Sequence, residues 1–332
     1  MQKKEIAGMG CLILTALIWG LAFVSQVQGM DSMSPLFFNA TRFTLGALSL
    51  VPLLVALRMR QHSASGSSRV LVSGKAPTIT LGDGRAIAMP SCLGNPVVVG
   101  IICGLVLFTA STTQQYGVLY CRSAGRSGFI TALYIVMVPL LAFMVLRRRI
   151  HANVIVSVVL AVFGFYLLCI TDGFGSITLA DLVLLGSAVL FAAHILVIDT
   201  FGRDLDALTI SFFQTATTAV LSWIGTLMEG SVDWSGAGQA WLAVVYAGVG
   251  SVGVAYTLQV IGQQFVPPTR GAMLMSLESF FSALGGAIIL GEVMTPRGYL
   301  GCALIFAGTM LAQAPVERLA RRRSRSLSLI HI

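Results

Sequence analysis

Charged residues are scarce in this chain. They make up 10% of its 332 residues, whereas a soluble domain carries roughly 25%. Hydrophobic residues account for 56% of the sequence, and the mean hydropathy is +0.87. A surface of this size cannot be covered with so few water-compatible groups, so we expect lipid to be the solvent for much of the chain.

Signatures of metal, redox and nucleotide chemistry are also missing. The six cysteines form no C-x-x-C pair, and no Walker A, H-E-x-x-H or G-x-S-x-G sequence occurs. The run Gly248–Gly253 matches G-x-G-x-x-G, but it lies inside a long apolar segment, where close helix packing explains it better. We therefore expect no enzyme, no cofactor and no metal. Membrane topology explains the net charge of +8 better than a nucleic-acid partner does.

What the chain does contain is a series of apolar segments of about 20 residues, the length that crosses a hydrocarbon core. They predict an all-α membrane protein with ten transmembrane helices. The expected spans cover residues 8–27, 35–57, 96–118, 124–146, 151–170, 179–199, 208–228, 239–263, 268–291 and 296–314.

The two halves of the chain repeat one another. Residues of the second half match residues of the first at a separation of 144 positions, or 172 upstream of an insertion at about 60–95. The matched pairs are Gln115/Gln259, Arg126/Arg270, Leu133/Leu277 and Gly164/Gly308 at 144, and Ala16/Ala188 and Arg42/Gln214 at 172. Five spans in each half predict an inverted repeat, a layout typical of membrane carriers.

The repeats set the expected organisation of the chain. Residues 8–170 form the first five-helix repeat with the polar cytoplasmic insertion 60–95, residues 179–314 form the second, and 315–332 form a basic cytoplasmic tail. With both termini cytoplasmic, 17 of the 21 Lys and Arg residues fall on the inner side, led by Arg147–Arg149. Three fall outside, and of these Arg122 and Arg126 lie close together in one turn. We expect a multi-pass protein of the inner (plasma) membrane.

Several short motifs resemble EamA-type members of the drug/metabolite transporter superfamily. They are Ile18-Trp19-Gly20 with Phe23, Pro35 with Arg42, the run Gly125–Tyr134 ending before Pro139, and Ser276-Leu277-Glu278 leading to Gly291-Glu292. The resemblance implies a ten-helix carrier made of two EamA repeats that works without ATP, and it favours export. Two features depart from the family pattern: Ser279 stands where a proline usually follows the Leu-Glu pair, and the insertion is unusually long.

Glu278 is the first candidate site residue because it lies about ten residues into the ninth span, roughly 15 Å deep. An ionisable group at that depth must be paired, protonated or exposed to water. It would exchange protons or bind a cation, or else cap a broken helix or bond a neighbouring backbone group. The repeat places Tyr134 at the equivalent position of the first half, and this pair is the predicted central site.

Three further polar candidates have structural alternatives. Arg42 would bind an anionic substrate or pair with an acid, but its depth also allows the side chain to reach the interface. Gln115 and Gln259 are repeat mates that would line a solute path or bond neighbouring helices.

Aromatic and imidazole groups complete the candidates. His194 in the sixth span would relay protons near neutral pH, although a lone histidine is more often a packing residue. Trp19 and Tyr256 would stack on a substrate, with interfacial or packing roles as the more common alternative.

These observations predict a secondary transporter that moves a small organic solute (a metabolite, amino acid or drug-like compound) by alternating access, with proton coupling or exchange. An intramembrane enzyme and a non-transporting scaffold or sensor are the alternatives. The expected partners are the solute, the proton and membrane lipid, without nucleic acid; a homodimer is left open.

Overall fold

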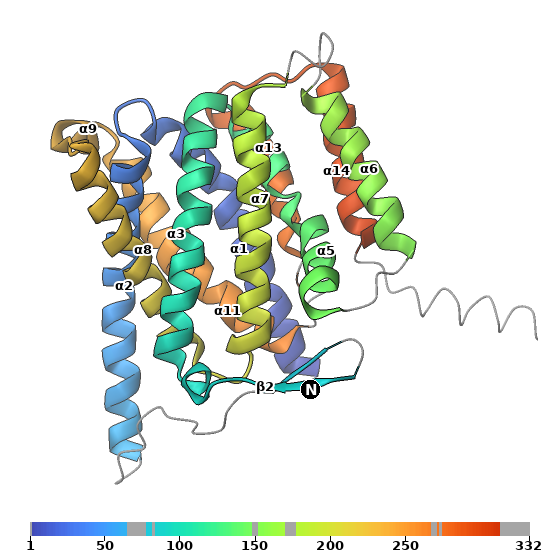
Figure 1. The fold of residues 1–332 in the computed structure, drawn as a ribbon. Helices are drawn as coiled ribbons and strands as arrows, with labels where there is room; N and C mark the ends of the chain where they lie inside the picture. The colour runs from blue at the N-terminus through green and yellow to red at the C-terminus, as the bar shows by residue number, and fades with distance from the viewer. Residues whose placement is uncertain are drawn as a thin grey trace, which may run out of the picture.

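The structure is a computed structural model that describes residues 2–64, 78–81, 84–147, 152–169, 177–266, 271 and 274–312, and this part is almost entirely helical (Figure 1). The predicted tail 315–332 lies outside the described residues, as do Arg148, Arg149 and Arg270.

The described part of the first half contains six α-helices. They are α1 (Gln2–Gly29), α2 (Pro35–Ala64), α3 (Pro96–Cys121), α4 (Ala124–Thr131), α5 (Tyr134–Leu146) and α6 (Ala152–Cys169). Side-chain caps mark several helix starts, because the first backbone N–H groups of a helix have no intrahelical partner. The Asn95 carboxamide accepts from the Val97 N–H at 2.9 Å, directly before Pro96, and the Ser123 hydroxyl accepts from the Arg126 N–H at 3.2 Å.

The insertion between α2 and α3 contains more structure than the predicted linker. Strand β1 (Thr78–Thr80) pairs antiparallel with β2 (Ala86–Ala88), and Gly84 adopts a positive φ of 84° in the turn between them. A short 3-10 helix η1 (Ser91–Gly94) then leads into α3. Strands of three residues are too short to produce an apolar period that sequence patterns can reveal.

The second half contains two π-helical segments besides α-helices. Its elements are α7 (Leu179–Val197), η3 (Ile198–Gly202), α8 (Ala207–Glu229), α9 (Trp234–Gln239), α10 (Trp241–Val245), η4 (Tyr246–Ala255), α11 (Tyr256–Phe265), α13 (Leu277–Ile289) and α14 (Pro296–Ala312). Segments η3 and η4 are the π-helices. Such segments are rare and often lie at functional sites.

Seven helical segments within the described residues are long and apolar enough to cross a membrane, and Ile155–Leu168 and Leu277–Ile289 are shorter apolar helices. The expected spans 124–146 and 239–263 are not continuous α-helices: the first divides into α4 and α5 after Thr131, and the second contains η4. Helix α13 begins at Leu277, well inside the expected span 268–291.

Equivalent helices of the two halves make equivalent contacts. Helix α1 packs on α13 and α11, and α7 packs on α4, α5 and α3. Two of the contacts between described helices join a helix to its own mate: α2 with α8, and α6 with α14. In Figure 1 α1 rises from the end marked N, whereas α7 begins at the opposite end and descends. This arrangement is an inverted repeat about an approximate two-fold axis.

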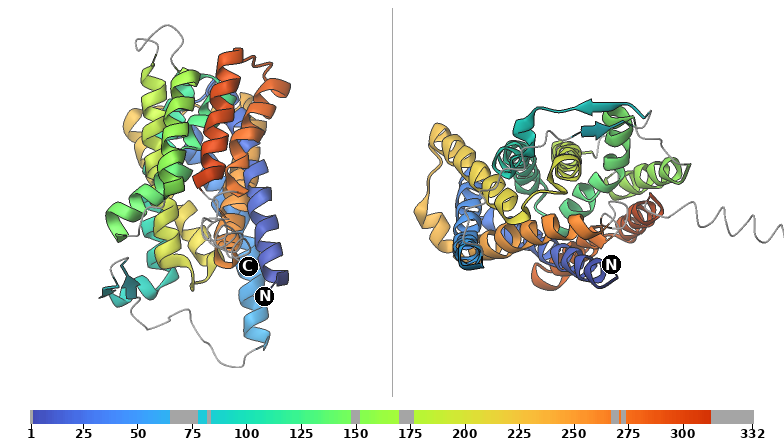
Figure 2. Two further views of the ribbon diagram at one scale, coloured as in Figure 1. Left: turned by 90° about the vertical axis from the view of Figure 1, so that its right-hand side faces the viewer. Right: turned by 90° about the horizontal axis from the view of Figure 1, so that it is seen from below.

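Glycines allow the closest helix contacts. A Cβ atom on Gly301 would lie 2.6 Å from the Gly164 carbonyl oxygen, so α6 and α14 approach backbone to backbone. These two helices lie side by side in both views of Figure 2, and the view from below shows them at one side of the bundle. A Cβ atom on Gly248 would lie 2.9 Å from the Arg42 carbonyl oxygen. The predicted packing role of the Gly248–Gly253 run is thus confirmed at Gly248.

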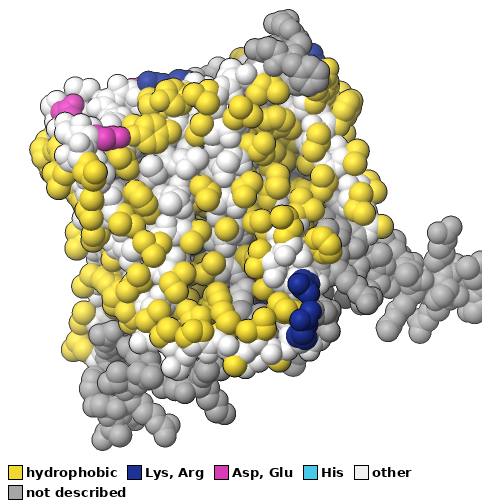
Figure 3. All heavy atoms as spheres, viewed as in Figure 1, with side chains coloured by type: hydrophobic (Ala, Val, Ile, Leu, Met, Phe, Trp, Pro, Cys, Tyr) yellow, Lys and Arg dark blue, Asp and Glu magenta, His cyan; other side chains and the backbone are white. Residues whose placement is uncertain are grey.

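Apolar side chains dominate the outside of the bundle. Figure 3 shows hydrophobic groups over the face in view, with the described charged groups near its edges. Large exposed side chains such as Met144, Leu227 and Ile288 (74%, 68% and 73% exposed) belong to this surface. A surface of this kind is expected where lipid replaces water.

Candidate functional site

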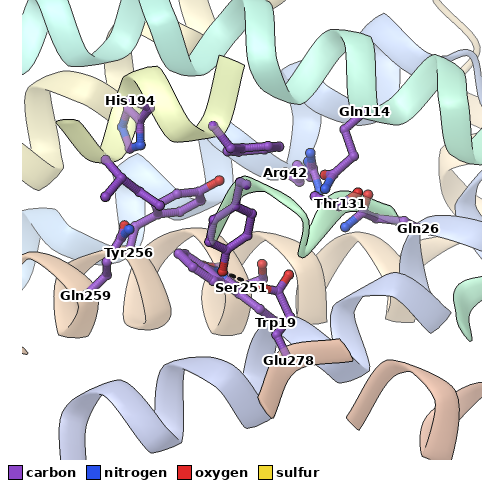
Figure 4. Close-up of a pocket in the computed structure, with 13 residues that line it drawn as sticks. Trp19, Gln26, Arg42, Gln114, Thr131, His194, Ser251, Tyr256, Gln259 and Glu278 are labelled. Atoms are coloured by element: carbon purple, nitrogen blue, oxygen red, sulfur yellow. Dashed lines mark hydrogen bonds between the residues drawn. The ribbon is translucent and has the colours of Figure 1, made fainter. Parts of the chain in front are cut away.

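A cavity of about 510 Å³, which includes its open part, lies between the two halves (Figure 4). Both repeats supply its walls. The lining residues are Trp19, Gln26, Arg42, Gln114, Thr131, Tyr134, Phe191, His194, Ile195, Ser251, Tyr256, Gln259 and Glu278. Seven of the eight candidate residues from the sequence are among them.

Tyr134 and Glu278 meet in this cavity. The Tyr134 hydroxyl donates a hydrogen bond of 3.0 Å to Glu278 Oε2, and the two side chains are 3% and 5% exposed (dashed line, Figure 4). Each residue stands in the first turn of a helix, α5 or α13, directly after a break in its span. Glu278 therefore bonds a side chain from the other repeat, and its described hydrogen bond involves no backbone amide. The repeat mates thus face each other across the axis.

Aromatic rings form another wall. The Trp19 and Tyr256 rings meet edge to face with centroids 4.9 Å apart, and Trp19 Nε1 donates to the Ser251 carbonyl at 3.2 Å. Ser251 belongs to η4. Phe191 also lines the cavity, 172 positions after Trp19, so these two aromatic residues are repeat mates. Their rings give the cavity π-faces suited to an apolar or cationic group.

Arg42 lies inside the cavity wall rather than at the interface. It is 3% exposed, and its guanidinium carbon stands 5.4 Å and 5.1 Å from the ring centroids of Phe38 and Phe43. Its Nε has no hydrogen-bond partner. The structure therefore places Arg42 against the cavity and against two aromatic rings, not along a path to the membrane surface.

His194 is held by the repeat mate of Arg42. Its Nε2 lies 3.0 Å from Gln214 Oε1, its side chain is 1% exposed, and its ring is perpendicular to that of Tyr256. This hydrogen bond satisfies one ring nitrogen, which fits the alternative that His194 is a packing residue. His194 nevertheless lines the cavity as well.

The two repeat-matched glutamines differ. Gln259 lines the cavity, and its Oε1 has no hydrogen-bond partner. Gln115 does not line it: its Nε2 points to the Gln26 carbonyl at 3.4 Å, and its neighbour Gln114 faces the cavity instead. Of the two roles predicted for Gln115, this contact fits the bond to a neighbouring helix. The helix α3 has polar residues on several sides around Gln115, so its sequence does not fix which glutamine turns toward the cavity.

Six lining residues were not among the candidates: Gln26, Gln114, Thr131, Phe191, Ile195 and Ser251. Phe191 could have been found from the register of 172 positions, and Thr131 from the motif that ends at Tyr134. Ser251 lies in the Gly248–Gly253 run, which we explained from the sequence by helix packing alone, although one side of this run faces the cavity. Nothing in the sequence distinguishes Gln26 from other polar residues of its span.

A set of polar contacts joins the repeats at the end of the bundle opposite the start of α1. Glu292, between α13 and α14, accepts from the Ala124 and Gly125 N–H groups at 2.6 and 3.1 Å and from the Ser123 hydroxyl at 2.8 Å. Its carboxylate therefore sits at the N-terminus of α4, where backbone N–H groups favour an anion.

Arginine–aspartate pairs extend this contact set. Arg126 Nε and Nη2 donate to the two carboxylate oxygens of Asp181 on α7 at 2.9 and 2.7 Å, and Asp181 is 1% exposed. Arg122 pairs with Asp31. Both arginines that depart from the expected charge distribution are thus neutralised by aspartates of other helices. We call the contacts of Glu292 and the Arg126–Asp181 pair the α4 clamp.

The EamA-like transporter family model matches residues 6–170 and 178–313. The chain belongs to this family. The resemblance drawn from the short motifs is confirmed, and with it the two EamA repeats. The family match and the apolar helices make the chain a multi-pass membrane protein of a transporter family.

Characterised and uncharacterised transporters resemble this chain over most of its length. An "Uncharacterized transporter" of Archaeoglobus fulgidus is 26% identical over 95% of this chain and 88% of its own length. The "Threonine/homoserine exporter RhtA" of Escherichia coli K12 is 26% identical over 82% of this chain and 93% of its own. The "Uncharacterized transporter YwfM" of Bacillus subtilis is 22% identical over 97% of both chains.

A solved crystal structure has the same fold. It superimposes with a TM-score of 0.63 at 18% sequence identity and covers 93% of this chain and 95% of its own.

Proposed function

We propose that this chain is a ten-helix secondary transporter that moves a small organic solute across the inner membrane by alternating access, coupled to protons or to exchange. The observation that carries the proposal is the contact between Tyr134 and Glu278 in a cavity lined by both repeats. Carriers built from inverted repeats hold their substrate and coupling-ion sites near the midplane, where the repeats meet.

Glu278 is the proposed coupling group. A buried carboxylate without a cationic partner is costly in a membrane, so such residues mark ion pathways. Tyr134 gives it one hydrogen bond, which leaves room on the carboxylate for a proton or for a cationic group of the solute.

The α4 clamp is the proposed closure at one end of the cavity. It links α4 of the first repeat to α7 and to the α13–α14 turn of the second. The register places Met9 where Asp181 stands, so the opposite end cannot form the same ion pair. We infer that opening toward the clamp end breaks these contacts, and that this end faces the outside, with both termini cytoplasmic.

The test is solute counterflow in sealed vesicles that contain the purified protein, with and without a pH gradient. The panel covers amino acids, organic acids and cationic drugs; threonine and homoserine enter it because the printed name of RhtA says that it exports them. We expect counterflow of at least one class. No flux from protein shown to be folded would overturn the carrier proposal.

Glu278→Gln addresses the coupling step. Loss of the titratable carboxylate should abolish the dependence of flux on the pH gradient, while solute exchange persists at saturating solute. Tyr134→Phe is the matched variant, since it removes only the hydrogen bond and should keep the pH dependence. Unchanged pH dependence in Glu278→Gln would exclude this residue as the proton site.

A further inference from the structure

Arg42 is a buried cation without an anionic partner. Within the described residues it forms no ion pair, its Nε has no hydrogen-bond partner, and its contacts are with the faces of Phe38 and Phe43. Two aromatic rings offset only part of the loss of water around a guanidinium. A charge held in this way beside a cavity is expected to receive its counter-charge from a bound ligand.

The same cavity contains a carboxylate with spare acceptor capacity. Glu278 accepts one hydrogen bond, from Tyr134, although an ionised carboxylate can accept about four. In Figure 4 the labelled side chains of Arg42, Gln114, Thr131 and Gln26 lie on one side of the pocket, and Glu278 lies apart from them beside Trp19. The cavity therefore has a cationic side at Arg42 and, when Glu278 is ionised, an anionic side.

We propose that the cavity selects zwitterionic solutes, the class of the free α-amino acids, by binding their carboxylate at Arg42 and their ammonium group at Glu278. The planar guanidinium suits a carboxylate, which it can bind with two parallel hydrogen bonds. The Trp19 ring lies beside Glu278 in Figure 4, and an aromatic ring at this side of the cavity favours a cation further.

This inference rests on the proposed transport function and adds the substrate class to it. A solute with one charge satisfies only one side of the cavity and leaves the other charge unpaired, which opposes its binding. Selectivity for a zwitterion therefore requires both Arg42 and Glu278. Arg42 should recognise the carboxylate of the solute, and Glu278 its ammonium group.

The experiment compares three related compounds on the full-length protein. They are L-threonine, 1-amino-2-propanol (threonine without its carboxylate) and 3-hydroxybutanoate (threonine without its ammonium group). Affinity is measured from the rise of the unfolding temperature in detergent, because a ligand that binds only the folded state stabilises it. The 20 common L-amino acids are screened first, so that a preferred amino acid and its two analogues can replace this set.

We expect the amino acid to bind at least about 10-fold more tightly than either analogue at a pH at which Glu278 is ionised, because each analogue then leaves one buried charge unpaired. Arg42→Gln should remove the advantage of the amino acid over the amine, and Glu278→Gln its advantage over the acid. Arg42→Lys keeps the positive charge but cannot make the two parallel hydrogen bonds of a guanidinium, so it should retain part of the affinity. Arg122→Gln and Glu229→Gln change an arginine and a glutamate outside the cavity and should leave all affinities unchanged.

Two results would overturn the proposal. One is that no amino acid binds more tightly than its singly charged analogues. The other is that Arg42→Gln, still folded by its unfolding temperature, binds amino acid and amine with the same ratio as the parent protein. Counterflow of an uncharged or singly charged solute, unaffected by Arg42→Gln, would reject the substrate class and keep the carrier. Absence of all counterflow would reject the carrier itself.

Discussion

The Arg126–Asp181 pair yields a quantitative prediction about the α4 clamp. Asp181 is almost fully buried, whereas the Arg126 side chain is 27% exposed. Removing one partner of a buried pair costs about 3–5 kcal/mol, because the other charge is left uncompensated. The two partners should therefore respond unequally to neutralisation.

Arg126→Gln leaves the buried carboxylate of Asp181, but Thr178 still donates to it from its N–H at 3.0 Å and its hydroxyl at 2.8 Å. We therefore reduce the expected loss of unfolding free energy to about 2 kcal/mol. Asp181→Asn leaves an arginine that can turn toward water, and it weakens the capping box of α7. We expect this variant to lose about 1 kcal/mol of unfolding free energy. The double variant has no orphan charge and should lose about 1.5 kcal/mol, which gives a coupling of about 1.5 kcal/mol.

The assay is denaturant unfolding of the four proteins in detergent, followed by tryptophan fluorescence. Coupling below about 0.5 kcal/mol would refute the reasoning, since sites that do not interact add within that margin. Flux measurements on the same proteins then test the clamp as a closure, because weakening it should raise the population that is open at this end.

Two further predictions concern packing and topology. Gly301→Val should lower the unfolding free energy by about 1–3 kcal/mol, since its side chain would meet the Gly164 carbonyl. Gly186→Ala, where nothing lies within 4 Å of the added Cβ, should be neutral or stabilising by up to about 1 kcal/mol, and equal effects would contradict the close contact. In a protein whose other cysteines are replaced, the exposed Cys92 should label from the cytoplasmic side, and a Ser235→Cys variant lacking Cys92 from the outside. Labelling of both from one side would reject the proposed orientation.

The repeat was the most useful feature of the sequence for locating the cavity. Tyr134 and Glu278 are 144 positions apart and come together because inverted repeats bring equivalent positions to the axis. Trp19 and Phe191 follow the same rule at 172 positions. These inferences needed only the register between the two halves. Because the register is set by matches along the whole chain, an error of a few residues in one helix boundary does not change it.

Helix rotation and backbone breaks could not be predicted in the same way. Gln114 and Gln115 are chemically identical neighbours, and tertiary contacts with α1 decide which of them faces the cavity. The span around Thr131 has no glycine or proline at its break, where the N–H groups of Leu133, Ile135 and Val136 bond carbonyls three residues earlier. Only packing in the folded chain distinguishes that tightened turn from a regular helix.

The contacts between mates have a consequence for motion. In a carrier whose two open states exchange the roles of its repeats, a contact between unlike helices must be replaced by its counterpart. A contact between an element and its own mate is its own counterpart and can stay in place. The α2–α8 and α6–α14 contacts are of this kind, as is the Tyr134–Glu278 hydrogen bond between α5 and α13. These groups stand at the pivot of such a motion, so Glu278 would meet each aqueous compartment in turn without itself travelling across the membrane.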